Sequence, residues 1–403
     1  MEERQNRFGR GVAVGIMSTL VAVVILVAGV AAALKLTGWQ GFQGSGVKDG
    51  YGIENAETLK KLNLLQQYID KYFLYEVDRE AVANRLYQGL VAGLDDPYAD
   101  YYTAEEYKEL KEQSSGEYYG IGVSVSQDIA TNEITITQVF SGGPAEEAGL
   151  APGDILYEVN DTLITTWNMS DVVELIRGVE GSTVKIIVYR PSENCYRGFD
   201  VERRQVQENT VIHEMLEEGI GYLQLTSFDL VSPKQFASAL ADLRTQGMKA
   251  FVLDLRNNGG GDLTSVVNIG NQILPKGTIL TIDYSDGSEE VYKSEGKSPM
   301  DVPMVILVNG NTASAAEVLS GAAKDHEIAT LVGVQTYGKG IVQTLFPLGD
   351  GTAIKLTVAD YYTPSGANIH GVGITPDVIV ELGESGEDTQ LEKALEILKQ
   401  DMR

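Results

Sequence analysis

The stretch Met304–Gly321 reads MVILVNGNTASAAEVLSG. It bears both on the fold of the chain and on whether one of its serines is chemically active. Its apolar start predicts a buried strand, and the small residues that follow Ser314 predict a helix. Ser314 lies at the junction of the two elements. Ser314–Glu317 has the form of a capping box, in which a serine simply begins the helix. Alternatively, the serine lies at a helix N-terminus because its hydroxyl is chemically active.

Strands and helices alternate on both sides of this stretch. Gly221–Phe228 and Ala250–Leu255 have the composition of strands, and Ser232-Pro233 begins a helix between them. Another helix is predicted from about Leu263, and another strand at 328–333. Such alternation favours a layered α/β core, which we assign to residues 204–382. Residues 383–403 form an acidic linker and one amphipathic tail helix, whose apolar stripe consists of Leu391, Ala394, Leu395 and Leu398.

Residues 114–203 have a different pattern. YYGIGVSVS at 118–126 and ITITQV at 134–139 alternate apolar and polar residues, as strands do. The turn PAEEAGLAPGD at Pro144–Asp154 follows, and then a short helix starts at Ser170. With its glycine-containing loop before the first strand, this segment resembles a PDZ domain. The resemblance implies a peptide-binding site formed by Tyr119, Gly120, Ile121, Gly122 and Val123.

The N-terminal part contains an apolar run. Residues 11–34 carry no charge and, at about 1.5 Å per residue, can span a bilayer core of about 30 Å. We expect an uncleaved single-pass anchor after a cytoplasmic segment at 1–10, followed by a linker at 35–53; a cleaved signal peptide is the alternative. Three arginines precede the run: Arg4, Arg7 and Arg10. They predict that the N-terminus lies inside the cell and that the chain after the anchor lies outside the cytoplasm.

Residues 54–113 show helical apolar spacing and form a predicted helical region for dimerisation or capping. Neither this region nor the tail helix contains enough apolar partners within its own segment. We therefore expect both to form a homodimer contact, which the family resemblance described below also suggests.

Composition excludes several classes of function. The net charge of the 403-residue chain is −26, which argues against nucleic-acid binding. Cys195 is the only cysteine, so an internal disulfide and a thiolate metal cluster are excluded. The three histidines lack the H-E-x-x-H spacing of a metal site, and we expect neither a metal nor a cofactor.

A nucleophilic Ser314 requires a base. His326 lies about 18 Å along the predicted helix, too far for proton transfer, whereas His370 in a glycine-rich stretch remains possible. Lys339, between two glycines and before an apolar run, is the other candidate, provided that burial lowers its pKa. Gln343 lies four residues further on and can hold the amine.

The segment LDLRNNGGGDL at Leu253–Leu263 follows a buried strand and leaves backbone N–H groups exposed. Such a turn suits either a phosphate or an oxyanion. The chain has neither a Walker lysine nor a G-x-G-x-x-G pattern here, which disfavours a nucleotide. Asp254 and Arg256 are predicted to be structural anchors.

Taken in order after a PDZ-like segment, DLRNNGGG, NTASAAE and TYGKGIVQ resemble the motifs of the carboxy-terminal processing proteases. The resemblance covers residues 54–381. It implies Ser314 as nucleophile, Lys339 as general base and Gln343 as the residue that orients the lysine. It also implies an oxyanion hole formed by the backbone of Ala315 and of a turn glycine, Gly260 by position. Many members have NPGG where this chain has NNGGG, so the donating glycine stays open.

The resemblance implies a crotonase-like or Clp-like layered core with an inserted PDZ domain, and a serine endopeptidase. With the anchor predicted at 11–34, we expect a membrane-anchored enzyme whose PDZ domain binds the free C-termini of its substrates. The PDZ domain is expected either to tether substrate or to gate the protease, with Arg177 at the end of its helix bridging to the core; we favour gating. Two other classes remain: a non-catalytic PDZ scaffold at the membrane, and a crotonase-type enzyme acting on acyl-CoA.

Overall fold

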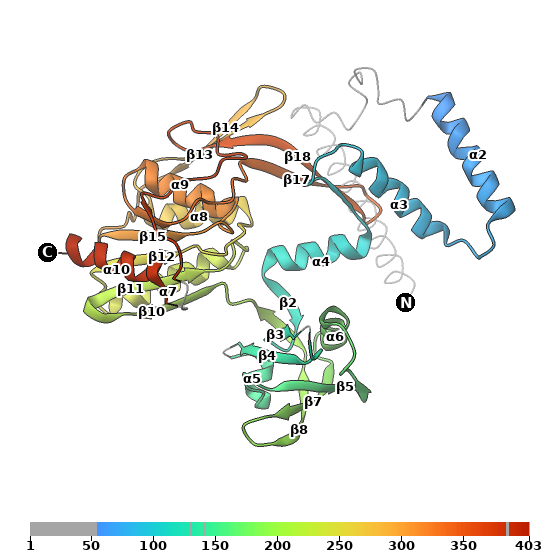
Figure 1. Ribbon diagram of the computed structural model, residues 1–403, viewed down its shortest axis with the longest axis horizontal. Coiled ribbons are helices and arrows are strands. Elements are labelled where there is room, and N and C mark those ends of the chain that lie inside the picture. The colour runs from blue at the N-terminus through green and yellow to red at the C-terminus, as the bar shows by residue number, and fades with distance from the viewer. Residues whose placement is uncertain (1–54, 129, 141, 384–386, 403) are drawn as a thin grey trace, which may run out of the picture. The chain divides into compact units, whose positions relative to one another are not determined.

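The structure, a computed structural model, describes residues 55–402 apart from 129, 141 and 384–386 (Figure 1). The predicted anchor at 11–34 and the flanking segments 1–10 and 35–53 lie outside the described residues. Among the residues that are described, none of the helices is both long enough and apolar enough to span a membrane.

A six-stranded sheet forms the centre of the core. Its strands lie in the order β10-β11-β12-β15-β16-β19, and all neighbours are parallel except β10, which pairs antiparallel with β11. Every residue of β12 and β15 is buried, as expected for parallel strands covered on both faces. The strands are β10 (Val211–Met215), β11 (Ile220–Leu225), β12 (Ala250–Asp254), β15 (Met304–Val308), β16 (Thr330–Gly333) and β19 (Val378–Ile379); the short η1 (Glu217–Gly219) joins the first two.

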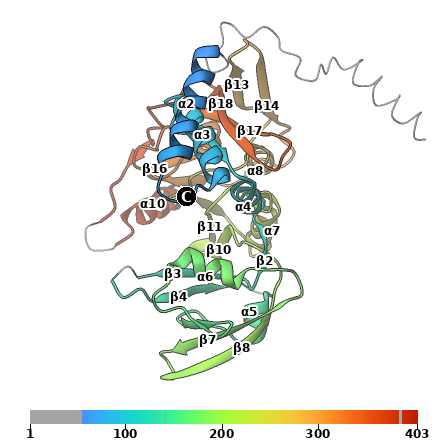
Figure 2. The same ribbon diagram turned by 90° about the vertical axis from the view of Figure 1, so that its right-hand side faces the viewer.

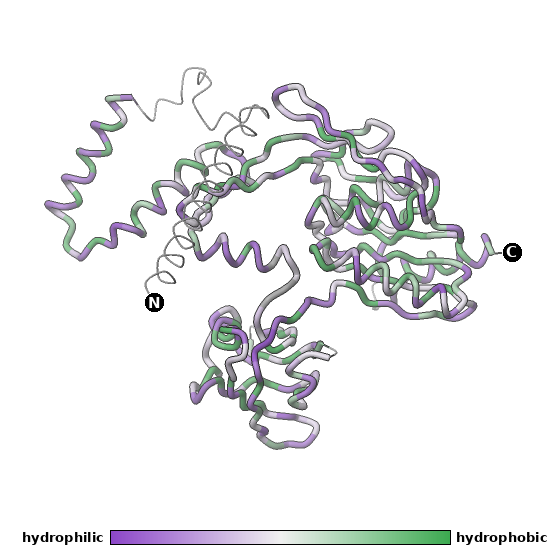
Figure 3. The backbone as a smooth tube through the Cα atoms, turned by 180° about the vertical axis from the view of Figure 1, so that it is seen from behind, coloured by the Kyte–Doolittle hydropathy of each residue, from purple (hydrophilic) through white to green (hydrophobic). Residues whose placement is uncertain are grey.

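Helices cover both faces of this sheet, and hydrophobic residues concentrate along its strands (Figure 3). Phe251 and Leu253 of β12 pack in a cluster with α7 (Ser232–Thr245), α8 (Leu263–Ile273) and α9 (Ala315–Asp325). The alternate residues of the same strand face α10 (Thr389–Asp401).

The tail helix therefore has a partner within its own chain. Ala394 and Leu398 of α10 are fully buried against the central sheet. We expected this apolar stripe to need a second subunit, and that expectation was wrong. The stripe covers sheet residues that are distant in sequence, which local composition did not indicate.

A second, antiparallel sheet completes the core (Figure 2). It has the order β1-β18-β13-β14, with β17 also paired to β18. Its apolar residues join the cluster around α8 and α9, so the layers run helix, sheet, helices, sheet. The predicted layered α/β core is confirmed. The strands are β1 (Asp100–Tyr102), β13 (Gly277–Tyr284), β14 (Glu289–Ser294), β17 (Ile341–Pro347) and β18 (Ala353–Tyr362).

The PDZ segment has its own sheet and hydrophobic cluster. The chain enters and leaves it on two paired strands, β2 (Glu117–Gly120) and β9 (Arg204–Gln207). Just beyond this pair, the Glu208 N–H donates to the Gly116 carbonyl at 2.8 Å. The elements are β3 (Val123–Gln127), β4 (Ile134–Val139), α5 (Pro144–Ala148), β5 (Ile155–Val159), β6 (Thr162–Leu163), α6 (Met169–Ile176), β7 (Thr183–Arg190) and β8 (Cys195–Glu202).

In the described residues before the PDZ segment, from residue 55 on, the helices are α2 (Ala56–Tyr72), α3 (Arg79–Ala92) and α4 (Ala104–Ser115). None of the residues of α2 is buried, and α3 buries only Val91. Apolar side chains of both helices are exposed: Leu59, Leu64, Leu65, Tyr68, Ile69 and Tyr72 of α2, and Val82, Leu86, Tyr87 and Leu90 of α3.

Candidate active site

Ser314 occupies a sharp turn between β15 and α9. Its φ of 54° and ψ of −120° lie in a region that residues other than glycine rarely adopt. The helix begins at the next residue, Ala315, so the serine is at the positive end of the helix dipole. The predicted capping box forms around Glu317, whose carboxylate accepts the Ser314 N–H at 2.9 Å. Backbone strain of this kind clusters at functional sites.

The glycine turn after β12 packs directly against Ser314. A Cβ added to Gly260 would lie 2.8 Å from the Ser314 Cβ and 2.9 Å from the Ala315 nitrogen, so only glycine fits there. The fully buried Asn258 holds the turn in place. Its amide nitrogen donates to the Leu225 carbonyl at 2.7 Å, and its backbone carbonyl accepts the Ala313 N–H at 3.0 Å.

The backbone N–H of Gly260, the predicted oxyanion donor, already makes a hydrogen bond within the turn. That group donates to the Asn258 side-chain oxygen at 2.8 Å. The neighbouring residues Gly259 and Gly261 line the cavity beside Ser314, together with Ala315. The turn therefore offers more than one glycine to that cavity.

Lys339 lies on the loop between β16 and β17. Burial, and next the charge of Lys355, hold the pKa of Lys339 below its ordinary value, while Asp96 acts in the opposite direction. The Lys339 Nζ lies 4.8 Å from the centroid of the Tyr98 ring. This aromatic neighbour comes from the segment before β1, and nothing in the local sequence of either residue indicated the contact.

Ser314, Lys339 and Gln343 line one cavity of about 400 Å³. Gln343 lies on β17, and its side-chain nitrogen is 3.5 Å from the Thr357 hydroxyl of the adjacent strand. The structure thus brings the three predicted residues to one site.

The two histidines near these motifs do not line that cavity. His326 ends α9 at the far end from Ser314, and its ring nitrogen lies 2.7 Å from the Thr278 carbonyl. His370 has an exposed side chain.

Asp254 and Arg256 act as anchors, as predicted. Asp254 is fully buried, and its carboxylate lies 2.7 Å from the Arg256 guanidinium. The same guanidinium bonds the carboxylate of Asp388 at 2.7 and 2.8 Å. Asp388 is the N-cap of α10, so this network fastens the tail helix to the glycine turn.

The predicted peptide-binding loop is shorter than expected. Tyr119 and Gly120 belong to β2 and pair with Gln205 and Arg204 of β9, so they are strand residues rather than loop residues. The loop proper consists of two residues. Ile121 buries its side chain in the PDZ core, Gly122 has a φ of 78°, and Val123 begins β3.

Arg177 ends α6, and its backbone N–H donates to the Val173 carbonyl. A different arginine caps the C-terminal end of this helix. Arg203 is buried and donates to the Ile176 and Leu175 carbonyls at 2.7 and 2.9 Å. The sequence offered no signal for this capping arginine, because it lies beyond two intervening strands.

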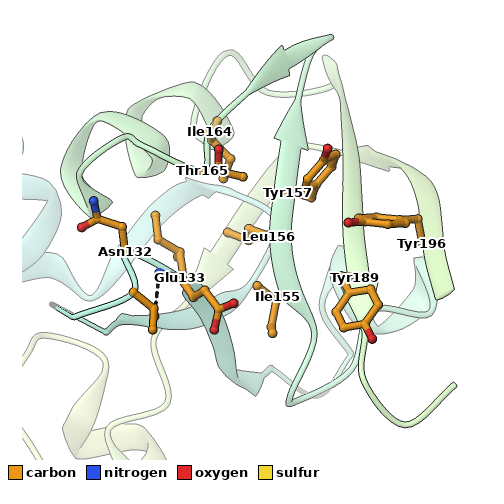
Figure 4. A pocket seen from close by; sticks show the side chains of 11 residues that line it. Asn132, Glu133, Ile155, Leu156, Tyr157, Ile164, Thr165, Tyr189 and Tyr196 are labelled. Carbon is orange, nitrogen blue, oxygen red and sulfur yellow. Dashed lines mark hydrogen bonds between the residues drawn. The ribbon is translucent and has the colours of Figure 1, made fainter. Parts of the chain in front are cut away.

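The PDZ domain has a separate cavity of about 360 Å³ (Figure 4). Tyr157, Tyr189 and Tyr196 form its aromatic side, with Tyr196 tilted against both other rings. Its lining includes Glu133 but no basic residue and none of residues 119–123. The cavity is therefore poorly suited to capturing a carboxylate.

A strained serine at a helix N-terminus, a half-buried lysine and a glycine turn around one cavity, on a layered core that carries a PDZ domain, are typical of a serine hydrolase. Residues 219–380 match the model of peptidase family S41, and residues 135–190 match a PDZ domain. The chain belongs to the carboxy-terminal processing proteases of family S41, and it is a serine-type processing peptidase.

The relatives that support this assignment match most of the chain. The carboxy-terminal processing protease CtpA of Bacillus subtilis is 35% identical over 336 residues, which cover 82% of this chain and 72% of the relative. A carboxyl-terminal-processing protease of Synechocystis is 34% identical over 320 residues, covering 77% and 75%. A solved structure from Bacteroides fragilis, assigned to the S41 proteases, shares the fold at 20% identity, with a TM-score of 0.51 over 76% of this chain and 87% of that chain.

Proposed function

We propose that Ser314 and Lys339 form a catalytic dyad of an endopeptidase, with Gln343 orienting the lysine. The observation that carries this proposal is the single cavity that all three residues line. The lowered pKa of Lys339 is the second support, since a general base has to be neutral when it accepts a proton.

The reaction is acyl transfer. Neutral Lys339 takes the proton of the Ser314 hydroxyl as its oxygen attacks the peptide carbonyl, and a tetrahedral oxyanion forms. The lysine then returns the proton to the leaving amine, which departs and leaves an acyl-enzyme. Water, deprotonated by the same lysine, attacks the ester, and the acid product leaves as Ser314 regains its proton.

The oxyanion lies at the N-terminus of α9. We assign one donor to the Ala315 N–H and the other to the glycine turn, where the helix dipole adds its partial charge. Gly260 fills the second role only by giving up its bond to Asn258, whereas Gly259 and Gly261 already line the cavity.

The protease is anchored in the cell membrane with its N-terminus inside and its catalytic domain outside. The uncharged run at 11–34 and the arginines before it support this topology. The relatives' names describe carboxyl-terminal processing, which suits exported protein substrates whose free C-termini the enzyme recognises.

The PDZ domain captures the substrate C-terminus and gates the protease. A bound peptide adds as a strand beside β3, with its carboxylate near Ile121 and Gly122. Arg177, at the end of α6, couples peptide binding by the PDZ domain to the activity of the protease core. A switch of this kind requires peptide to bind the active arrangement more tightly than the resting one.

The enzyme is a homodimer through its N-terminal helices. The apolar residues that α2 exposes, and separately those that α3 exposes, support this assignment, because exposed apolar surface commonly marks an interaction site. The central sheet already covers the apolar stripe of the tail helix, so we assign the contact to the N-terminal helices alone.

A fluorophosphonate probe tests the dyad. We expect the full-length protein to be labelled at one serine, and the Ser314→Ala and Lys339→Ala variants to remain unlabelled while folded. A wild-type protein that binds C-terminal peptides but takes no label would instead be a non-catalytic PDZ scaffold.

A further inference from the structure

Two buried side chains connect the loop that carries Ser314 with the loop that carries Lys339. They are Glu317, in the first turn of α9, and Tyr361, on β18. The proposed reaction uses neither group. Glu317 is fully buried, and Tyr361 is 3% exposed.

Glu317 collects hydrogen bonds from both dyad residues. One carboxylate oxygen accepts the Ser314 N–H at 2.9 Å and the Lys339 N–H at 2.8 Å. The other oxygen accepts the Gly338 N–H at 2.8 Å and the Thr336 hydroxyl at 2.5 Å. No salt bridge to Glu317 occurs in the part of the chain that the structure describes, so these four donors satisfy the buried carboxylate.

The Tyr361 hydroxyl contacts the backbone carbonyl oxygens of the same two residues, Ser314 and Lys339. Its hydroxyl lies 2.6 Å from the Lys339 carbonyl and 3.1 Å from the Ser314 carbonyl. A hydroxyl has one proton, so the shorter contact is the main bond and the longer one shares it. Burial, and next the charge of Glu317, raise the pKa of Tyr361 well above its ordinary value, so the hydroxyl stays a donor.

We propose that Glu317 and Tyr361 form a backbone clamp, which fixes the position of the proposed nucleophile relative to the proposed base. Glu317 accepts the N–H groups of Ser314 and Lys339, and Tyr361 donates to their carbonyls. The clamp thereby holds both main chains, and the two side chains are left to react. This inference rests on the proposed dyad, and both clamp members are positioning residues.

The local structure explains why a clamp is needed. Residues 334–340 belong to no helix or strand, so no ladder of hydrogen bonds holds Lys339 in place. Ser314 has a strained backbone, which persists only when its surroundings hold it. Misplacement of reacting groups by about 1 Å can lower a rate about a hundredfold, so two mobile loops would lose most of the catalytic advantage.

The test compares Glu317→Gln and Tyr361→Phe with wild type in the full-length protein. Tyr361→Phe keeps the ring that lines the cavity and removes only the donor. In Glu317→Gln, one acceptor oxygen becomes an amide that faces backbone donors. We expect each variant to stay folded, to lose at least tenfold in kcat on a short peptide with KM within threefold, and to react correspondingly more slowly with a fluorophosphonate.

Two further variants control for a general loss of stability. Tyr101→Phe removes a hydroxyl from another buried tyrosine, which bonds Asn84 at 3.3 Å. Asp154→Asn alters another buried carboxylate, which lies in the PDZ segment and pairs with Arg190 at 2.7 Å. We expect both to lower the melting temperature but to keep kcat per folded molecule within about twofold of wild type, because neither contacts the dyad.

The clamp is overturned if folded Tyr361→Phe keeps a kcat within twofold of wild type, or if the controls lose as much kcat as the clamp variants. Should Glu317→Gln fail to fold, Tyr361→Phe alone decides. Ser314→Ala and Lys339→Ala, assayed in parallel, separate the two levels of the argument. If both of these variants are inactive while Tyr361→Phe is active, only the clamp proposal is refuted. If Lys339→Ala is active, the dyad proposal is refuted, and the clamp proposal, which rests on it, is refuted too.

Discussion

Ser314 has a backbone conformation that costs a residue with a side chain about 1–3 kcal/mol. The surroundings that offset this cost are specific: Gly260 leaves space behind the serine, and Glu317 bonds its N–H. A helix cap alone requires neither feature, since an ordinary N-cap residue has an extended backbone. The geometry of this residue therefore favours the chemical interpretation over simple capping.

Substitution of either dyad residue is expected to abolish proteolysis. Ser314→Ala removes the nucleophile and Lys339→Ala the base, so each should lower kcat by at least a hundredfold without unfolding the protein. Gln343→Ala should be milder, because that side chain only positions the amine. Peptide cleavage measured beside circular dichroism gives the answer.

The chelator EDTA serves as a control in the same assay and should leave the rate unchanged. Retention of more than a few per cent of activity by Lys339→Ala, or inhibition by EDTA, would contradict the Ser–Lys assignment.

Charges near Lys339 should move the pH dependence in opposite directions. Activity requires the neutral amine, so it rises with pH through the pKa of Lys339. Lys355 lowers that pKa and Asp96 raises it. Lys355→Gln should therefore shift the rise in kcat/KM to higher pH, and Asp96→Asn should shift it to lower pH.

Both variants keep a local polar contact. Glutamine can still donate to Tyr102, and asparagine can still accept the Tyr98 N–H. At a pH on the rising limb, Lys355→Gln should be severalfold slower than wild type and Asp96→Asn faster. Shifts in the same direction for both variants would show that the titrating group is not Lys339.

Among the elements, α10 should stabilise the core. Leu398 is fully buried against the central sheet, so Leu398→Ala should cost about 2–5 kcal/mol of unfolding free energy. Leu348, 53% exposed in the β17–β18 connection, is the matched control, and Leu348→Ala should change stability by about 0.5 kcal/mol or less. Denaturant unfolding of both variants is the measurement, and equal losses would argue against the docking of α10.

The elements near the site were largely predictable from local patterns. An apolar strand at Met304–Val308, a helix after Ser314 and a helix from Leu263 all form as expected. Hydrophobic periodicity carries that information within a few residues. The docking of α10 and the cap that Arg203 supplies to α6 were missed, because each depends on a partner distant in sequence.

At the scale of the whole molecule, the order of three motifs carried the family resemblance that named Ser314, Lys339 and Gln343 together, and in the structure these three residues line one cavity. It did not predict that Tyr98 faces the Lys339 amine, nor that Gly260 already bonds Asn258. These contacts arise from tertiary packing, and they have no periodic or compositional signature in one sequence.

Gating by the PDZ domain predicts activation in trans. A reporter too short to reach the PDZ groove should be cleaved severalfold faster when a separate C-terminal peptide is added, since peptide shifts the population toward the active state. Arg177→Ala should remove this acceleration while the peptide still binds. Arg197→Ala, at an exposed arginine of the same domain, should retain it. Unchanged reporter cleavage at saturating peptide would instead favour simple tethering.

The N-terminal helices predict a dimer. Sedimentation of a soluble form from about residue 45 should show a dimer that Leu65→Glu weakens, because a charge replaces an exposed apolar side chain of α2. Gln66→Glu adds the same charge at an exposed polar position and should leave the dimer intact. A monomer at high protein concentration would refute the prediction.

The pairing of β2 with β9 has a consequence for the order in which the chain matures. Strands of the protease core come from both sides of the PDZ segment, since β1 precedes it and β10 to β19 follow it. A PDZ segment that folds first brings Gly116 and Glu208 together. The parts of the protease core before and after the PDZ segment are then joined by a short connection instead of a long unfolded loop. The entropy of closing that loop is then lost before the core assembles. A nascent chain with a misfolded PDZ segment would consequently also be slow to assemble its core and cavity.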